Sequence, residues 1–350
     1  HVLIECDSNE GEDLICLRAT DLEIGIKQTC KGIVHEGGAT TADARKLYEI
    51  TRELPTGKVV VSSTGNGWVH VQSGNSRFRI ASLEPKEFPT LAAVDNQGTE
   101  NQEQSSNIQI EGQILHEMVA KTLFAASPDE TRLNLSGVYL ETDDSGKLRM
   151  VASDGHRLAL IEKNVGTGSS NWPSVILPKK GLLETRKLLE KSNEKVEIYL
   201  DNSVLNVKKD TTQLFMRLVE GDFPDYKQVV PAEHTHEVQF SRDELLRCLR
   251  RILILTTERS RGVKLKFEEG KIEVSVNTPE LGEGTEDIPA KYEGAGLSIG
   301  FNGRYMTEAL NVMGDGVEAT LFLKDDASPG LLQKKDSGEF SYVIMPMKIN

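Results

Sequence analysis

The sequence predicts an α+β fold built from three similar segments. A hairpin of alternating apolar and polar residues occurs three times, a helical stretch follows each hairpin, and Phe-Pro or Met-Pro closes each segment. The spacing also agrees, since residue 43 to Phe88 and Pro178 to Phe223 are both 45 residues, and Asn302 to Met345 is 43. Similar patterns at similar intervals indicate a repeated structural unit.

The three hairpins are predicted at residues 2–21, 138–154 and 263–277. Apolar residues alternate with polar ones in each, which is typical of strands with one buried face. The polar strings DDSG (143–146) and EEG (268–270) separate the two strands of the second and third hairpins. The helical stretches that follow are predicted at 44–54, 179–191 and 303–313.

A further strand and helix precede the second and third hairpins, with the helices predicted at 112–126 and 241–255. The first segment begins directly at its hairpin. By the logic of the repeat, we expect a strand and a helix of about 28–30 residues before His1.

The helix predicted at 241–255 separates apolar from basic residues. Ser241 and Glu244 form a capping box, which indicates the helix start. At 100° per residue one face is apolar and the opposite face is basic. The apolar face holds Leu245, Leu246, Leu249, Ile252 and Leu253, and the basic face holds Arg247, Arg250 and Arg251.

Two polar stretches divide the chain. Residues 95–107 (DNQGTENQEQSSN) contain no apolar side chain, which is typical of a linker, and residues 231–236 (PAEHTH) form a shorter break. We therefore expect three domains at 1–104, 105–233 and 234–350.

Charge is distributed unevenly between helices and the rest of the chain. The 350 residues carry a net charge of −13, which taken alone argues against nucleic acid or an anionic membrane as a partner. The five predicted helical stretches with their flanks nevertheless sum to +5 and the remainder to −18. The acidic total therefore does not exclude a nucleic-acid partner.

Composition also favours a protein without a cofactor. Cys6, Cys16, Cys30 and Cys248 have neither paired nor clustered spacing, so we expect free thiols and no metal site. The apolar run 252–255 is far too short to cross a membrane.

Asp154 and His156 could form an acid–base pair in an enzyme, since histidine titrates near neutrality. No third ligand, nucleophile motif or glycine-rich phosphate loop accompanies them. We therefore favour a structural role for the pair and expect no catalytic residue.

Four local strings resemble one known family. They are VASDGHRLAL (151–160), EGDFPDY (220–226), GFN (300–302) and MPMKI (345–349). In order and spacing they resemble the bacterial DNA polymerase III beta subunits, the sliding clamps. The resemblance implies three DNA-clamp domains per chain and a head-to-tail homodimer ring, with helices lining a central hole and antiparallel sheets outside. Such a ring encircles duplex DNA independently of sequence and has no catalysis or cofactor.

The resemblance implies a cytoplasmic, nucleoid-associated processivity factor that tethers the replicative polymerase. It also implies that the polymerase III core, the clamp loader, other polymerases and repair proteins dock linear peptides between domains two and three. The matching peptide-binding positions are Leu135, Ser153, Gly155, His156, Arg157, Leu158, Pro224, Val229, Asn302, Tyr305, Met306, Val343, Met345, Pro346 and Met347.

Two further sets of positions follow from the resemblance. The candidates for facing DNA are Arg45, Lys121, Arg132, Lys179, Lys180, Lys187, Arg247, Arg250 and Arg304. The candidates for the dimer interface are Lys46, Arg77, Phe78 and Ile80 on one side, and Ile254, Leu255, Glu280, Glu283 and Glu286 on the other. The acidic total leaves one alternative open, a peptide-binding scaffold that acts without DNA.

Overall fold

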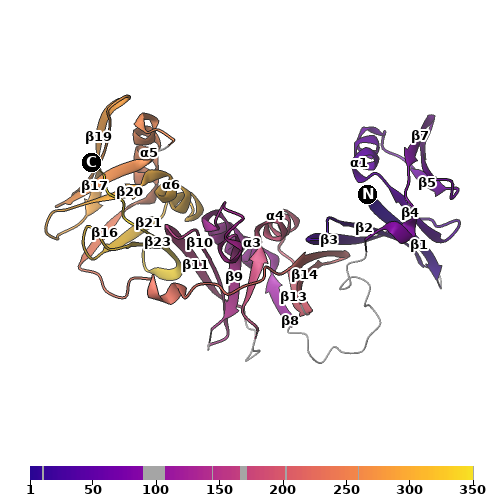
Figure 1. Cartoon of the computed structure of the whole chain (residues 1–350), viewed down its shortest axis with the longest axis horizontal. Helices are drawn as coiled ribbons and strands as arrows, with labels where there is room; N and C mark the ends of the chain where they lie inside the picture. The colour runs from indigo at the N-terminus through magenta and orange to yellow at the C-terminus, as the bar shows by residue number, and fades with distance from the viewer. Residues whose placement is uncertain are drawn as a thin grey trace. The chain divides into compact units, whose positions relative to one another are not determined.

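The structure is a computed structural model, and it describes residues 1–9, 12–89, 107–143, 145–165, 172–201, 203–258 and 260–349. By its internal contacts the chain divides into two compact units (Figure 1). Unit 1 comprises residues 1–112 and 183–218, and unit 2 comprises residues 113–182 and 219–350. The predicted linker at 95–107 lies outside the described residues except for Asn107.

Unit 1 contains an eight-stranded antiparallel sheet in the order β4-β1-β2-β3-β15-β14-β13-β8. Its strands are β1 (Val2–Asn9), β2 (Glu12–Thr20), β3 (Ile24–Lys31), β4 (Gly38–Ala42), β8 (Asn107–Glu111), β13 (Lys195–Asp201), β14 (Val204–Lys209) and β15 (Thr212–Arg217). β15 pairs with β3, where Leu214 lies opposite Ile26. One sheet thus joins strands from the first and second predicted segments.

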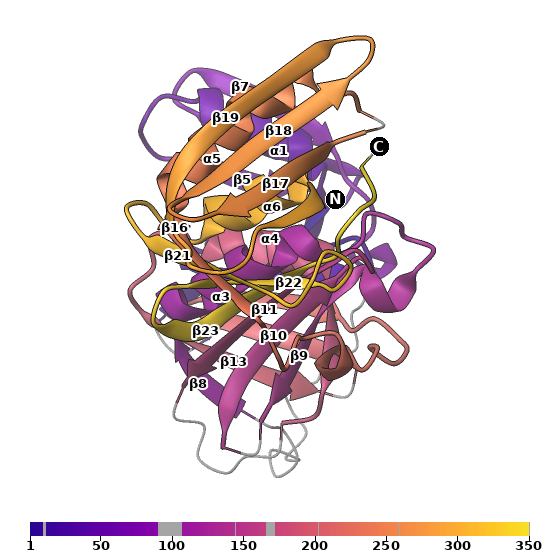
Figure 2. The same cartoon turned by 90° about the vertical axis from the view of Figure 1, so that its left-hand side faces the viewer.

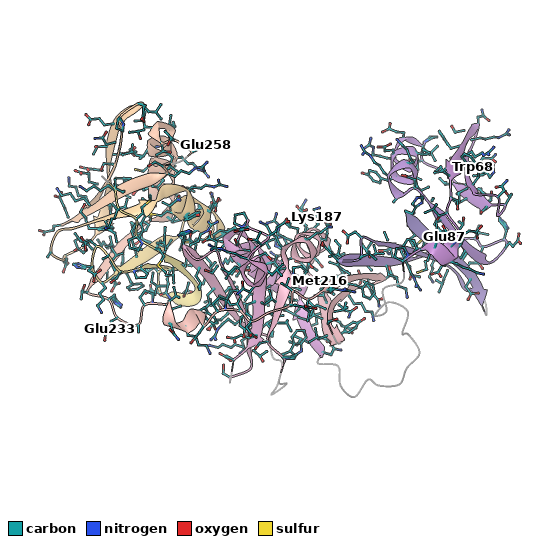
Figure 3. The ribbon with its side chains drawn as sticks, in the orientation of Figure 1. Trp68, Glu87, Lys187, Met216, Glu233 and Glu258 are labelled. Atoms are coloured by element: carbon teal, nitrogen blue, oxygen red, sulfur yellow. The ribbon has the colours of Figure 1, made fainter. Side chains whose placement is uncertain are left out.

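A smaller sheet in unit 1 packs against helix α1 (Ala44–Glu53). Its strands are β5 (Val60–Ser63), β6 (Trp68–Ser73) and β7 (Ser76–Ala81). The core consists of Val69, Val71 and Ile80, with Leu47, Ile50 and Leu54 packed against it. Trp68, labelled in Figure 3, lies on β6 with the Arg79 guanidinium 3.9 Å from its ring centroid.

Unit 2 contains a twelve-stranded antiparallel sheet in the order β12-β9-β10-β11-β23-β22-β21-β16-β19-β18-β17-β20. In that order the strands are Val175–Pro178, Gly137–Thr142, Lys147–Ser153, Arg157–Asn164, Ser337–Ile344, Gly330–Lys334, Glu318–Leu323, His236–Ser241, Gly282–Lys291, Lys271–Thr278, Gly262–Glu268 and Leu297–Asn302. β11 pairs with β23, where Leu158 lies opposite Val343. This pairing joins the second and third predicted segments.

The longer helices confirm the predicted positions. They are α3 (Gly112–Thr122), α4 (Lys179–Leu188), α5 (Arg242–Ile252) and α6 (Gly303–Val312), and the division between the units passes through α4. The Ser241 hydroxyl accepts a hydrogen bond from the Glu244 amide at 3.4 Å, as the capping box predicted. α5 packs against α6 and against β18 and β19 (Figure 2).

Three helices end three or four residues earlier than predicted. The helix predicted at 112–126 ends at Thr122 and continues as a 3₁₀ helix at Leu123–Ala125. The helix predicted to reach residue 255 becomes a 3₁₀ turn at Leu253–Leu255, and α4 ends at Leu188 instead of Lys191. Lys191 has a φ of +62°, in the left-handed region where right-handed helices stop. Short 3₁₀ helices also occur at Pro85–Glu87, Leu123–Ala125, Leu133–Leu135 and Tyr226–Gln228. The predicted α+β class is confirmed.

Candidate functional site

The turn between β10 and β11 is held by side chain-to-backbone hydrogen bonds. The Ser153 hydroxyl donates to the Arg157 carbonyl at 2.8 Å and accepts from the Gly155 amide at 3.1 Å. Asp154 Oδ1 accepts from the amides of His156 (2.9 Å) and Arg157 (3.1 Å). Gly155 has a φ of +88°, which glycine adopts without strain. These bonds fix the backbone of residues 153–157, which we call the 153–157 turn.

The Arg157 side chain is almost fully buried, with 7% of its surface exposed. Its Nε donates to Asp154 Oδ2 at 3.0 Å, one Nη donates to Glu308, and the other Nη donates to the Phe124 carbonyl at 2.7 Å. The guanidinium carbon lies 4.1 Å from the Tyr305 ring centroid. A buried charge needs such partners, since an unpaired one is strongly destabilising.

Glu308 links this turn to helix α6. Its carboxylate accepts hydrogen bonds from Arg157 and, at 2.7 Å, from Arg304 Nε one helical turn away. Burial alone would raise the pKa of Glu308, but the two arginine hydrogen bonds outweigh it and lower that pKa. Glu308 therefore remains ionised between the two cations.

An apolar cluster begins at Leu158, the residue after the 153–157 turn. Its buried members are Val151, Leu158, Leu160, Tyr226, Leu331 and Val343, and Tyr139, Phe223, Val229, Val230 and Phe322 pack against them half-buried. The Tyr139 and Phe223 rings stack with centroids 5.0 Å apart. The β11–β23 pairing thus brings predicted peptide-binding residues from distant parts of the sequence into one cluster.

Tyr226 anchors the segment that carries Pro224 and Val229. Its hydroxyl donates to Glu141 at 2.5 Å and accepts from Arg149 at 2.8 Å. Burial raises the pKa of Tyr226, and the hydrogen bond to Glu141 adds to that effect. Pro224 itself is exposed, and Val229 is half-buried.

The C-terminal segment crosses the same region. The Met345 amide donates to the His156 carbonyl at 2.9 Å, and the Met347 amide donates to the Gly300 carbonyl at 2.9 Å. Both methionines and Pro346 are half-buried. Methionine side chains at this depth form an apolar wall that can adapt to different partners.

The remaining predicted peptide-binding residues lie near this region. Leu135 is half-buried in its 3₁₀ turn, and the Asn302 side chain caps α6 by accepting from the Arg304 and Tyr305 amides. Met306 is only 1% exposed, about as deeply buried as Leu158 and Val343. Its place in a neighbouring subsite stays a prediction.

Most predicted DNA-facing residues are exposed, and several of them form ion pairs with a carboxylate three or four residues away. Arg45 contacts Glu49 at 2.9 Å, and Lys187, labelled in Figure 3, contacts Glu184 at 2.8 Å. The exposed members are Arg45, Arg132, Lys179, Lys180, Lys187, Arg247, Arg250 and Arg304. Lys121 differs, since 19% of its side chain is exposed and it contacts Glu117 at 2.6 Å.

Arg247 and Arg250 line a hollow between α5 and α6, together with Leu246 and Asn311. The buried Arg242 closes one side by donating to Asp243 (2.6 Å) and Asp315 (2.7 Å) and to the Leu310 carbonyl (2.6 Å). Sequence reasoning missed Arg242, because its position next to the helix cap gave no sign that it reaches the end of α6.

The predicted interface residues of unit 1 lie on and beside β7, which is an edge strand as expected. Arg77 and Phe78 are exposed, and Lys46 contacts Glu49 at 2.9 Å. Ile80 is 6% exposed and belongs to the core with Val69 and Val71. The Ile80 side chain therefore packs inside this unit, and its place in an interface, through the backbone of the edge strand, stays a prediction.

The predicted interface residues of unit 2 include an unusually exposed aliphatic side chain. Ile254 is 75% exposed, while Leu255 is half-buried. Glu280 and Glu283 are exposed, and Glu286 pairs with Arg251. Hydrogen bonding to Arg251 lowers the pKa of Glu286.

The hydrogen bonds of Asp154 do not favour the enzyme alternative. Both of its oxygens bind Arg157 or backbone amides, and its contact with His156 is to the amide instead of the imidazole. Among the described residues, no group of three or more potential ligands could hold a metal, and the four cysteines are free thiols. In this same part of the chain, no helix is long and apolar enough to span a membrane.

Comparison with known proteins identifies the family. Models of the DNA polymerase III beta subunit match the N-terminal domain at 3–92, the central domain at 109–225 and the C-terminal domain at 227–348. The beta sliding clamp of Caulobacter vibrioides is 33% identical over 347 residues, covering 98% of this chain and 91% of that protein. The clamp of Pseudomonas aeruginosa is 32% identical over 341 residues, covering 97% and 90%.

Solved structures agree. The DNA polymerase III subunit beta from Pseudomonas aeruginosa matches with a TM-score of 0.90 at 31% identity, covering 99% of this chain and 92% of that one. A Bartonella birtlesii sliding clamp bound to griselimycin also gives 0.90, at 30% identity and with 99% and 91% covered. The chain therefore belongs to the DNA polymerase III beta subunit family, and it is a DNA sliding clamp with three clamp domains, a non-catalytic processivity factor of replication.

Proposed function

We propose that this clamp forms a head-to-tail ring with a second copy, encircles duplex DNA and tethers the replicative polymerase in the cytoplasm. We assign its domains to residues 1–104, 105–233 and 234–350. The exposed arginines and lysines of the helices support the proposal, because their surface ion pairs are weak and can exchange for phosphates. A closed ring needs few strong phosphate contacts, since each one resists sliding.

Retention on circular DNA tests the ring. The clamp is loaded on a closed plasmid with a clamp loader and ATP, and the complex is isolated by gel filtration. We expect the clamp to co-elute with the circle and to be released when a restriction enzyme linearises it. A clamp that never co-elutes, or that stays bound after cutting, would favour the alternative of a scaffold that acts without encircling DNA.

Dimer closure is tested at Ile254 and Leu255. We propose that these residues, with Glu280, Glu283 and Glu286, meet Lys46, Arg77 and Phe78 of the second copy, where opposite charges set the orientation. The double substitution Ile254→Ala and Leu255→Ala should lower the dimer fraction measured by light scattering at low concentration. Ile33→Ala, another exposed aliphatic position, is the control. An unchanged mass for the double variant would refute the assignment.

We further propose that the 153–157 turn and the apolar cluster beside it dock linear peptides. The polymerase III core, the clamp loader, other polymerases and repair proteins would supply those peptides. The observation that carries the proposal is the packing of Leu158, Val343 and Val229 beside a turn fixed by hydrogen bonds. A related clamp has been crystallised with griselimycin, which supports a ligand-binding site on this fold.

The peptide site is tested with a fluorescein-labelled hexapeptide that carries one Leu and one Phe. Burying one such anchor contributes roughly 1.5–3 kcal/mol, so two anchors together with backbone hydrogen bonds suggest about micromolar affinity. Met345→Ala should raise the Kd severalfold in fluorescence anisotropy, and griselimycin should compete with the probe. Ile33→Ala should leave the Kd unchanged. If Met345→Ala and Ile33→Ala bound the peptide with equal affinity, the peptide would bind elsewhere on the clamp.

A further inference from the structure

We propose that Glu308 of α6 is a positioning residue of the peptide site: it holds Arg157, and through Arg157 it holds the 153–157 turn in the shape that accepts a peptide. This inference rests on the proposed peptide docking and deepens it. Glu308 is outside the set of residues that the sequence predicted to contact the peptide.

The geometry forms an unbroken series of hydrogen bonds. Glu308 accepts from one Nη of Arg157, and Nε of Arg157 donates to Asp154. The other oxygen of Asp154 accepts from the amides of His156 and Arg157, which are the backbone of the turn itself. The His156 carbonyl in turn accepts from the Met345 amide. A change in the orientation of Arg157 therefore reaches both the turn and the C-terminal segment.

Two partners tie Arg157 to other elements: the Phe124 carbonyl, in the 3₁₀ helix that follows α3, and Glu308, the charged partner on α6. Asp154 lies three residues from Arg157 on the same turn, so the two can move together. Glu308 lies 151 residues further along the chain, on a helix whose residues Met306, Ala309 and Leu310 are buried. The Tyr305 ring adds a stacking contact, but a flat face lets the guanidinium slide. Only the carboxylate fixes its direction toward α6.

Arg304 supplies an internal control. It is the second cation on Glu308, at 2.7 Å, and its side chain is 55% exposed. Removing Arg304 leaves the bond between Arg157 and Glu308 intact. Glu308→Gln keeps the size of the side chain but removes its charge, and Arg304→Ala removes a partner of the same carboxylate without touching the turn.

Hydrogen exchange tests the positioning role without any peptide. In E308Q we expect amide exchange of the 153–157 turn, measured by mass spectrometry, to accelerate at least fivefold, while β23 and the remainder of α6 keep wild-type protection. R304A should match the wild type everywhere. Unchanged exchange in E308Q would overturn the proposal, and so would a loss of protection spread over α6 and β23, which indicates a general structural role.

Peptide affinity tests the consequence. With the same labelled hexapeptide, E308Q should raise the Kd roughly fivefold to tenfold, and R304A should stay within twofold of the wild type. A wild-type protein that binds no peptide would refute the docking proposal, while the exchange data would still decide whether Glu308 holds the turn. If E308Q does not fold, Glu308→Asp, whose carboxylate is one methylene shorter, is measured in both assays. Wild-type exchange and affinity in E308D would then overturn the proposal.

Discussion

The 153–157 turn and the basic helix faces use arginine in opposite ways. Arg157 is 7% exposed and its guanidinium binds Asp154, Glu308 and a backbone carbonyl. Arg45 has a side chain that is 84% exposed and forms an ion pair with Glu49, four residues away on α1. The Arg157 side chain is therefore held in place by its partners, whereas the Arg45 side chain can leave Glu49 at little cost in free energy.

This difference matches two kinds of recognition. A short peptide offers few contacts. It therefore binds more tightly to a surface that is already ordered, because no free energy is lost in ordering that surface on binding. A clamp that slides along duplex DNA meets phosphates at every step. An arginine held in one place would bind one of these phosphates and resist sliding. The clamp thus has rigid charge at the proposed peptide site and loosely paired charge on its helices.

Arg157→Ala should destabilise the protein most. The substitution leaves the carboxylates of Asp154 and Glu308 without the guanidinium, and breaking a buried ion pair in this way costs about 3–5 kcal/mol. Urea unfolding measures the loss. Arg304→Ala, which removes an exposed partner of Glu308, should cost at most about 0.5 kcal/mol. A loss below about 1 kcal/mol for Arg157→Ala would remove the contrast between the two regions.

Tyr226→Phe tests the second polar anchor of the peptide site. The ring stays in the apolar cluster, but the hydroxyl that binds Glu141 and Arg149 is lost. We expect a loss of about 1–2 kcal/mol in unfolding free energy and weaker binding of the labelled hexapeptide. Tyr48→Phe, at an exposed tyrosine, is the matched control and should change neither quantity. If Tyr226→Phe and Tyr48→Phe were equally stable, packing alone would hold the segment that carries Pro224 and Val229.

The repeat was predictable from sequence because it depends on local periodicity. The hairpin at β17 and β18 alternates buried and less buried residues, as the polar-apolar pattern indicates. The pairings of β3 with β15 and of β11 with β23 join segments through long-range contacts. No local pattern encodes them, so the two continuous sheets could not be predicted.

The site was only partly predictable for the same reason. The family motifs gave Arg157 and Leu158 as peptide-binding positions, and Tyr226 lies within one of them, but they did not indicate Glu308 or Arg242. The hydrogen bond of Glu308 to Arg157 and that of Arg242 to the Leu310 carbonyl join residues 151 and 68 positions apart in sequence. Ile80 and Met306 show another limit: a position in a motif does not say how deeply its side chain is buried, and both side chains are almost fully buried.

The dependence of stability on pH should show what the ionised Glu308 carboxylate contributes. Its folded-state pKa is lowered, so the stability it contributes is complete above the unfolded carboxyl pKa, near 4.3, and is lost as pH falls through the folded value. The difference in unfolding free energy between wild type and E308Q, measured with urea, should therefore be constant near neutrality and shrink toward pH 3. Glu117, whose pKa is also lowered, titrates in both proteins, so its contribution cancels. A difference that grows on acidification would contradict the assignment.

Lys187→Ala should have the smallest effect on stability and a measurable one on DNA. Its side chain is 70% exposed and its pair with Glu184 is a surface contact, so unfolding should change by less than about 0.5 kcal/mol. If Lys187 contacts a phosphate, the slope of log affinity against log salt for a short duplex should fall by roughly 0.9. Lys335→Ala, at a lysine outside the predicted DNA-facing set, should leave that slope unchanged. An unchanged slope for Lys187→Ala would remove this lysine from the DNA-facing set. A large loss of stability in Lys187→Ala would instead show that Lys187 is held as firmly as Arg157. The helix faces and the 153–157 turn would then not differ in how they use charge.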